Sequence, residues 1–500
     1  MTTPLSINPL RLPEIRIEVG RYLKRPALAR CTSVCREWNQ TFTLLLYSVV
    51  DIRRWKVTIP PIEVLRLNMP FIKSMSVTAD MLHPSYSHLL LPNLETLKLC
   101  LSNYSDNIEF MIQNHKNIRS LELSCMASDG KNMYWKSVAS LPHLEKLTIR
   151  DQYGYETDIM WDICGRLKKF DITNLVISGL VGAPSTQTTD FHLLRDLTIS
   201  KVGSHITVQP ALMMKCQNIE RLEWRVDLDY LRTTAHITTL IQDFIQKLES
   251  GKWPKIKSLA VEFDYGLDET YARIIRALSD RTLEELDVSS TRFSELAFNE
   301  LKHRFQTLRV LNIRNCLYLT SANVLEILAS CRHLQSLTAD RIYAQYMDSS
   351  QEWPCRKTLQ YLSIEFELGQ EPNHNAPLAA AVVRARSQEL NEIVFTCLGQ
   401  LYELKHLSVS YYIPEKYSRL RQIYDPVSIP LKIHLSKGLQ KLVGLKRLNH
   451  FSVGALAGSL GRGEIVWMME NWPNLDIIEG FSKTSIRIPM KRAVKQKGIT

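Results

Sequence analysis

Residues 308–334 read LRVLNIRNCLYLTSANVLEILASCRHL, and this stretch combines two kinds of apolar spacing. Its first part begins with Leu308, and Leu311 and Ile313 then follow two residues apart. Such alternation is typical of a strand with one buried face. Its second part, SANVLEILAS, has apolar residues at helical spacing, and its first residue, Ser321, is suited to cap that helix. The stretch therefore predicts one strand followed by one helix.

The strand pattern recurs along the chain at nearly constant intervals. Its first apolar residue falls at Ile72, Leu94, Ile118, Leu144, Leu167, Leu194, Ile219, Ile256, Leu283, Leu308, Leu334 and Leu359. These positions give eleven intervals over 359 − 72 = 287 residues, an average of 26, and ten intervals lie between 22 and 27. One strand and one helix cannot bury their own apolar faces, so we expect the units to stack around a continuous core.

This periodicity resembles the leucine-rich repeat, whose usual period is about 20–29 residues. The resemblance implies an α/β solenoid with parallel strands on its concave face and helices on its convex face. Residues 308–334 look like the cysteine-containing subtype, in which we interpret Cys316 and Cys331 as small buried hydrophobic residues. The spacing is broken near 226–251 and 366–393, where we predict insertions.

The chain is predicted to have three parts: a helical module over 8–50, the repeats over 51–480 and a basic tail over 481–500. In the module, Leu12-Pro13-Glu14 fits a helix start, because proline is favoured in the first turn. Two sets of apolar residues have the spacing of helical faces. They are Ile15, Val19, Tyr22 and Leu23, and then Leu28, Cys31, Val34, Cys35 and Trp38. Three short helices make a small core, so we expect a partner or a docked neighbour.

The module resembles an F-box, through Leu12-Pro13, Glu14-Ile15 and the Val34-Cys35-Arg36-Glu37-Trp38 motif. Pro13 directly precedes Glu14, whereas the family usually has one residue between them. An F-box before leucine-rich repeats is the arrangement of F-box/leucine-rich-repeat proteins, and this chain is similar in style to the fungal members.

This resemblance implies a substrate-recognition subunit of a Skp–cullin–F-box ubiquitin ligase. The module would bind the Skp adaptor, and through it a cullin, while the repeats would hold an unknown protein substrate. The residues implied at the adaptor interface are Leu12, Pro13, Ile15, Leu23, Val34, Cys35 and Trp38. The alternative for Val34 and Trp38 is that they only form the core of the module.

The repeat pattern also predicts which charged side chains line the concave face, at its third, fifth and seventh positions. The first half offers Lys98, Glu122, Lys146, Arg150, Lys169, Asp171, Asp196, Arg221, Glu223 and Arg225, or 6 − 4 = +2. The second half offers Glu262, Glu285, Asp287, Arg314, Asp340 and Glu365, or 1 − 5 = −4.

We hypothesise a bipolar face that binds a protein segment of the opposite charge order. The substrate-binding residues would be Lys146, Arg150, Arg221, Arg225, Glu285, Asp287, Arg314 and Glu365. The alternative is that these are ordinary solvated side chains.

Composition and motifs favour a protein without a catalytic site. The chain has 62 Lys and Arg against 51 Asp and Glu, so its net charge of +11 over 500 residues is mild. Phosphate-binding, zinc-protease and serine-hydrolase motifs are absent, and the ten Cys form no C-x-x-C pair, so we expect no cofactor and no metal site. No stretch approaches about 18 apolar residues, and the start does not resemble a secretory signal. We expect no membrane partner and a cytoplasmic or nuclear location.

Two other functions remain open at this stage. One is a leucine-rich-repeat scaffold that works outside a cullin ligase. The other is a nucleic-acid binder that uses the net positive charge and the basic tail, although phosphates would meet the acidic second half of the repeats. We therefore expect no nucleic-acid partner.

Overall fold

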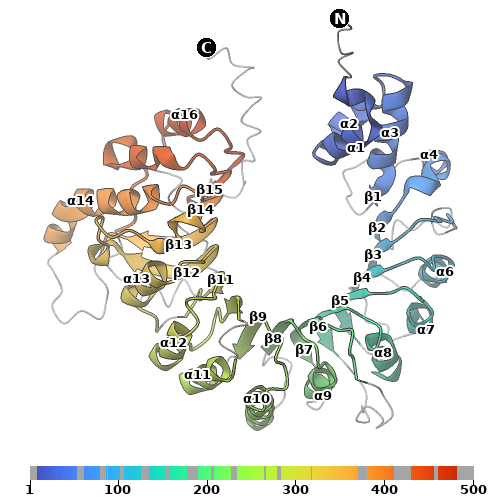
Figure 1. Cartoon of the computed structure of the whole chain (residues 1–500), viewed down its shortest axis with the longest axis horizontal. Coiled ribbons are helices and arrows are strands. Elements are labelled where there is room, and N and C mark those ends of the chain that lie inside the picture. The colour runs from blue at the N-terminus through green and yellow to red at the C-terminus, as the bar shows by residue number, and fades with distance from the viewer. Residues whose placement is uncertain are drawn as a thin grey trace, which may run out of the picture. The chain divides into compact units, whose positions relative to one another are not determined.

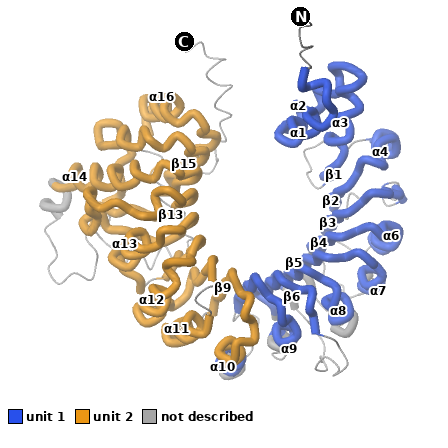
Figure 2. The backbone as a smooth tube through the Cα atoms, viewed as in Figure 1, with its two compact units in different colours: residues 1–243 blue, residues 244–500 orange. Residues whose placement is uncertain are grey.

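The computed structural model divides the chain into two compact units, residues 1–243 (unit 1) and 244–500 (unit 2) (Figure 2). The division lies within one helix, α10 (Thr234–Glu249). The described residues are 8–52, 61–78, 86, 88–101, 106–125, 134–153, 157–176, 190–203, 208–226, 234–263, 266–278, 283–316, 318–369, 380–409, 429–454, 456 and 460–480. The predicted basic tail, 481–500, lies outside them.

Parallel strands follow one another in chain order within each unit (Figure 1). In unit 1 they are β1 (Val49–Asp51), β2 (Ser74–Thr78), β3 (Thr96–Leu101), β4 (Ser120–Cys125), β5 (Lys146–Tyr153), β6 (Lys169–Val176), β7 (Asp196–Gly203) and β8 (Arg221–Val226). In unit 2 they are β9 (Ser258–Phe263), β10 (Glu285–Asp287), β11 (Val310–Asn312), β12 (Ser336–Tyr343), β13 (Tyr361–Glu367), β14 (His406–Ser408), β15 (His450–Ser452) and β16 (Ile477–Glu479).

The periodic apolar residues determine where the strands begin, as predicted. Each of the twelve anchors lies two residues before the first residue of a strand, from Ile72 before β2 to Leu359 before β13. Inside the strands, equivalent leucines pair across neighbours, for example Leu97 with Leu121 and Leu121 with Leu147. These side chains are fully buried, so stacking of the units makes the core. The α/β repeat solenoid is therefore confirmed.

Helices lie on one side of the strand row in each unit, and we call the other side the open face (Figure 1). The described helices of unit 1 are α1 (Pro13–Arg21), α2 (Arg25–Cys31), α3 (Arg36–Ser48), α4 (Ile62–Asn68), α6 (Asp106–Asn114), α7 (Tyr134–Ala139), α8 (Thr157–Cys164) and α9 (Val208–Lys215). Those of unit 2 are α11 (Asp268–Ala277), α12 (Glu295–Lys302), α13 (Ser321–Ser330), α14 (Ala380–Gly399) and α16 (Arg462–Asn471).

Short 3-10 turns complete the described elements. They are η1 (Pro9–Arg11), η2 (Met69–Phe71), η5 (Ala344–Tyr346), η6 (Pro354–Lys357), η7 (Leu435–Lys437) and η8 (Leu439–Gly444). In the described part of the chain, every helix is too short or too polar to span a bilayer.

The quoted stretch folds into β11 and α13, with one correction at the helix start. Thr320, not Ser321, caps α13: its hydroxyl accepts from the Asn323 backbone N–H, and the Asn323 side chain accepts from the Thr320 N–H. The Ser321 hydroxyl instead accepts from the N–H of Tyr343. Cys316 is buried as predicted, and burial raises the pKa of its thiol to about 12, which makes the thiol unreactive.

The two predicted insertions contain helices. The first, near 226–251, contains α10, whose sixteen residues make it longer than most repeat helices. The second, near 366–393, contains the start of α14, while 370–379 lie outside the described residues. After Leu404, three more strands, β14 to β16, continue the parallel order.

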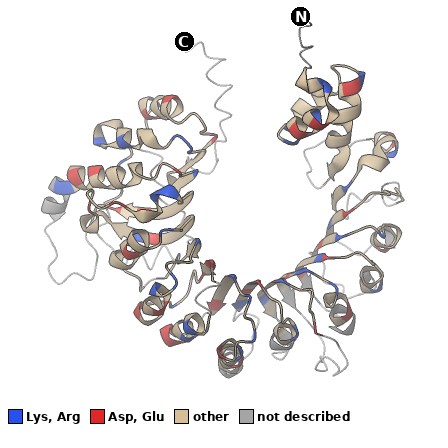
Figure 3. Ribbon diagram, viewed as in Figure 1, with Lys and Arg blue, Asp and Glu red and all other residues tan. Residues whose placement is uncertain are grey.

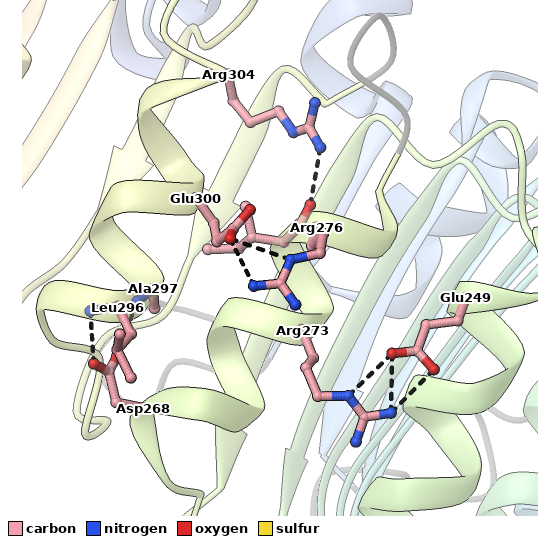
Figure 4. A network of polar contacts seen from close by, with 9 residues as sticks. Glu249, Asp268, Arg273, Arg276, Leu296, Ala297, Glu300 and Arg304 are labelled. Atoms are coloured by element: carbon pink, nitrogen blue, oxygen red, sulfur yellow. Dashed lines mark hydrogen bonds and ion pairs between the residues drawn. The ribbon is translucent and has the colours of Figure 1, made fainter.

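Polar contacts between successive helices reinforce the stacking in unit 2 (Figure 4). Arg273 pairs with Glu249 at 2.9 Å, and Arg276 pairs with Glu300 at 2.7 Å. The buried Arg304 guanidinium donates to two backbone carbonyls at the end of α11, those of Ile275 and Leu278. These contacts satisfy carbonyls that the helix end would otherwise leave without partners.

A similar device caps the start of a helix. The Asp268 carboxylate accepts from backbone N–H groups at the first turn of α12, those of Ser294, Leu296 and Ala297 (Figure 4). A carboxylate is favoured at a helix N-terminus, both as an acceptor and by its charge. One repeat thereby fixes the start of the next.

A buried histidine in unit 1 predicts a pH dependence of stability. His115 accepts from the Leu91 N–H at Nε2 (3.0 Å), so its proton must be on Nδ1, which donates to the Met111 carbonyl. Burial lowers the pKa of His115 below its usual value. The stabilisation is therefore complete above pH 6.5 and is lost as the pH falls through the lowered folded-state value.

We expect the urea midpoint of unit 1, followed by circular dichroism, to fall between pH 7 and pH 5. The His115→Leu variant should be less stable at pH 7 but should lose less on acidification. An equally steep pH dependence in this variant would show that other groups cause the effect.

Candidate protein-binding surfaces

The N-terminal helices α1–α3 form a small module that is closely packed at one point. A Cβ atom at Gly20 would lie 2.2 Å from the Leu45 Cδ1 atom, so any larger residue at this position requires the Leu45 side chain on α3 to move. Phe42 and Leu28 are also buried. The chain then passes directly from α3, which ends at Ser48, into β1. This strand spans the predicted module boundary at residue 50.

The buried side of α1 contains a charged residue. Arg16 is only 4% exposed; its Nε donates to the Thr41 hydroxyl at 3.1 Å and its Nη1 to the Leu10 carbonyl at 3.4 Å. Glu37 Oε2 lies 4.0 Å from the same Nη1. The guanidinium therefore joins η1, α1 and α3.

Four apolar residues in α1 or at its two caps are exposed instead. Leu12, Ile15, Val19 and Tyr22, which we call the α1 stripe, are 47%, 40%, 42% and 82% exposed. Three of them have the i, i+4, i+7 spacing of one helical face. An amphipathic helix of a monomer normally buries such a face, so this exposure is the unusual feature of the module.

Most of the residues predicted at the adaptor interface are exposed. Leu12, Pro13, Ile15, Val34 and Cys35 are exposed, and Leu23 and Trp38 are half-buried. Val34 is 61% exposed, so it is not part of the core of the module. Trp38 packs on Phe42 with ring centroids 5.3 Å apart, and it therefore contributes to the core as well as to the surface.

The prediction that Leu28, Cys31, Val34, Cys35 and Trp38 share one helical face was wrong, because these residues are divided between two helices and the link that joins them. α2 ends at Cys31 and α3 begins at Arg36, so Val34 and Cys35 lie in the link between them. The Thr32 and Ser33 hydroxyls donate to carbonyls at the end of α2, and such local bonds compete with helix continuation. The link borders a shallow hollow lined by Thr32, Ser33, Cys35, Arg36, Asn39 and Gln40.

In unit 1, most of the predicted charges on the open face neutralise one another. Within the described residues, the cross-strand pairs are Lys98–Glu122 (2.7 Å), Arg150–Asp171 (3.6 Å) and Lys169–Asp196 (3.7 Å), and β8 carries the pair Arg225–Glu223 (2.7 Å). The remaining predicted residues, Lys146 and Arg221, are exposed. The basic side of the bipolar hypothesis thus rests on few side chains.

In unit 2, the predicted acidic residues also lie on the open face, half-buried. Glu285 accepts from the Ser258 hydroxyl at 2.8 Å, and Asp287 accepts from the Ser289 N–H at 2.9 Å. Glu365 lies 3.5 Å from Arg341, a residue that the sequence analysis missed. The cause is a register shift in β12 between Thr338 and Arg341, which a strict alternation of faces does not include.

Unit 2 also has an aromatic stack that the sequence analysis missed. Tyr361, His406 and His450 pair in register on β13, β14 and β15. Their ring centroids are 4.2 Å and 4.1 Å apart, and His450 Nε2 lies 3.2 Å from Glu479. The available signal was that all three occupy the third position of the repeat pattern. We call these three residues the aromatic ladder.

Burial and the neighbouring charge of His450 lower the pKa of His406 to about 4. The middle ring of the ladder is therefore neutral at physiological pH. Figure 3 shows acidic and basic residues in both units. On the open face of unit 2, Arg341 and Glu479 join the predicted charges, which gives six carboxylates against two arginines among the described residues, or 2 − 6 = −4.

Comparisons with known proteins do not identify a family for this chain. No family model and no curated protein matches the sequence. One similar solved structure is an internalin (InlF) from Listeria monocytogenes, with 12% identity over 77% of this chain and 88% of the internalin, at a TM-score of 0.31. Another is the Rad7 and Elc1 complex from yeast, with 13% identity over 73% of this chain and 93% of the matched chain, at a TM-score of 0.40. At such scores, neither match bears on the function of this chain.

Proposed function

We propose that this chain is a substrate-recognition subunit of a Skp–cullin–F-box ubiquitin ligase. The α1–α3 module binds the Skp adaptor, and the repeats bind a protein substrate on their open face. The observation that carries the proposal is the exposed α1 stripe on a module whose residues resemble an F-box. The chain acts in the cytoplasm or the nucleus.

The adaptor explains why α1 turns a charged residue inward and its apolar residues outward. Protein interfaces bury an apolar centre inside a polar rim. Leu12, Ile15 and Val19 provide such a centre, while Glu18 and Arg21, which pair with each other at 2.7 Å, lie on the exposed surface of the same helix. Covering this surface offsets the small size of the module's own core.

The repeats need no active site in this function. A receptor raises the local concentration of its substrate beside the chemistry of another subunit. We accordingly propose that the chain is not an enzyme and binds no cofactor. The open face supplies polar and charged side chains for contacts with the substrate.

The test is adaptor binding by the full chain with substitutions on the exposed surface. The Ile15→Asp/Val34→Asp variant should lose at least about 30-fold in affinity for a purified Skp adaptor, since an interfacial hot spot is worth about 2 kcal/mol or more. Both side chains are exposed, so the circular dichroism spectrum and the unfolding midpoint should not change. Calorimetry or a pull-down gives the affinity.

A matched control is Leu67→Asp, because Leu67 is an exposed leucine on α4, outside the module. It should bind the adaptor as the wild type does. Adaptor binding that survives the double substitution would contradict the proposed interface. Adaptor capture without any co-purifying cullin would instead support a scaffold that works outside a cullin ligase.

A further inference from the structure

The aromatic ladder has one ring face without an aromatic neighbour. The outer strand next to Tyr361 is β12, where the residue in register is Ser336. Serine is too small to cover a phenol ring, and Tyr361 is 36% exposed. Among the described residues, His406 is the one ring that stacks on Tyr361. One more planar group stacked on Tyr361 would occupy the space above Ser336.

The surroundings of this space suit the side chain of an arginine. The next residue in the same row is Val310 on β11, which is half-buried and can pack against a methylene chain. A guanidinium is planar and weakly hydrated, so it stacks on aromatic faces within about 6 Å of the ring centroid. The lysine ammonium lacks this planar shape.

Charge favours the same group. Among the described residues, the open face of unit 2 carries six carboxylates against two arginines, and two of these carboxylates, Asp340 and Glu365, lie on β12 and β13, four residues along the strands from Ser336 and Tyr361. A stack containing a protonated histidine next to Tyr361 would repel a cation, but His406 is neutral at physiological pH. The ladder thus presents an uncharged ring within an acidic surface.

We propose that Tyr361 and the space above Ser336 form a subsite for an arginine side chain of the protein substrate. The guanidinium stacks on Tyr361 as a fourth rung of the aromatic ladder, and the net negative charge of the open face attracts it. This inference rests on the proposed function, because it names the class of substrate: an exposed segment that contains arginine.

The experiment uses the full chain without an adaptor, so it can be read even if adaptor binding fails. The probes are three fluorescein-labelled Gly/Ser peptides. The first contains four arginines, the second contains four lysines and the third contains four citrullines. Fluorescence anisotropy should give tighter binding of the arginine peptide than of the lysine peptide, and weak binding of the uncharged citrulline peptide. Tyr361→Ala should weaken arginine binding by about tenfold and lysine binding by less than about twofold.

Two further variants test the geometry. Tyr361→Phe keeps the ring and should stay within about threefold of wild type in arginine binding. Ser336→Trp should fill the space and reduce arginine binding as much as Tyr361→Ala does. Tyr402→Ala, which removes another exposed tyrosine of unit 2, should have no effect.

Several results would overturn the subsite. Equal affinities for arginine and lysine peptides in every variant would mean that the acidic surface attracts any cation. Unchanged arginine binding in Tyr361→Ala or in Ser336→Trp would exclude stacking at this position. Failure of the arginine peptide to bind the wild type would also overturn it, whereas the adaptor interface would remain untouched.

Discussion

Replacing Trp224 with alanine is expected to lower the free energy of unfolding of unit 1 by about 3–5 kcal/mol. Trp224 is fully buried on β8, and its Nε1 donates to Gln209 Oε1 at 2.8 Å. Gln209, which is buried on α9, donates in turn to the Val202 carbonyl on β7 at 2.9 Å. The substitution therefore creates a large cavity and removes one member of a buried polar chain that joins three elements.

Urea unfolding followed by circular dichroism measures this effect. The Trp224→Phe variant is the matched control: it keeps most of the ring but loses the donor, so it should cost about 1–2 kcal/mol. Unit 2 should unfold at an unchanged midpoint if each repeat contacts mainly its neighbours. A loss below about 1 kcal/mol for Trp224→Ala would show that the site collapses around the smaller residue.

Replacing Asn391 with leucine should destabilise unit 2 by about 3 kcal/mol, because it leaves several backbone groups without partners. Asn391 on α14 is fully buried. Its Oδ1 accepts from the Lys432 N–H at 2.8 Å, and its Nδ2 donates to the Lys432 carbonyl at 3.1 Å and the Lys437 carbonyl at 2.6 Å. One side chain thus anchors the backbone of residues 432–437 to α14.

Hydrogen exchange at residues 432–438 should detect this loss before global unfolding does. The Asn391→Asp variant keeps the shape but replaces the donor by a carboxylate facing two carbonyls, so it should also increase exchange. Glu389→Gln, an exposed change on the same helix, should stay within about 0.5 kcal/mol of wild type. Unaltered exchange in Asn391→Leu would mean that other contacts hold the segment.

The fold could be predicted from the sequence because each repeat contains the same information. The anchor leucines and isoleucines mark every strand from β2 to β13, and one error, such as the cap assigned to Ser321 instead of Thr320, does not shift the rest. Alternation within a strand also placed the charged residues on the open face. It failed at the β12 register shift, so Arg341 was missed.

The candidate surfaces were harder to predict for a physical reason. Helical spacing shows that Ile15, Val19 and Tyr22 share a face, but it cannot show whether that face meets the protein's own core or another molecule. The burial of Arg16 and the exposure of the α1 stripe show that this face does not meet the module's own core. The aromatic ladder depends on pairing between residues 45 and 44 positions apart, from Tyr361 to His406 and on to His450, and such pairing follows only from the full register.

The direct passage from α3 into β1 has a mechanical consequence. Ser48 ends the helix and Val49 begins the strand, and β1 is hydrogen-bonded to β2 by its whole length. A torque applied to the helices is therefore transmitted to the first repeats without a hinge to absorb it. If another protein binds α1, the direction of the first repeats relative to that protein is therefore fixed by the backbone. A flexible linker would instead let the repeats sample many directions.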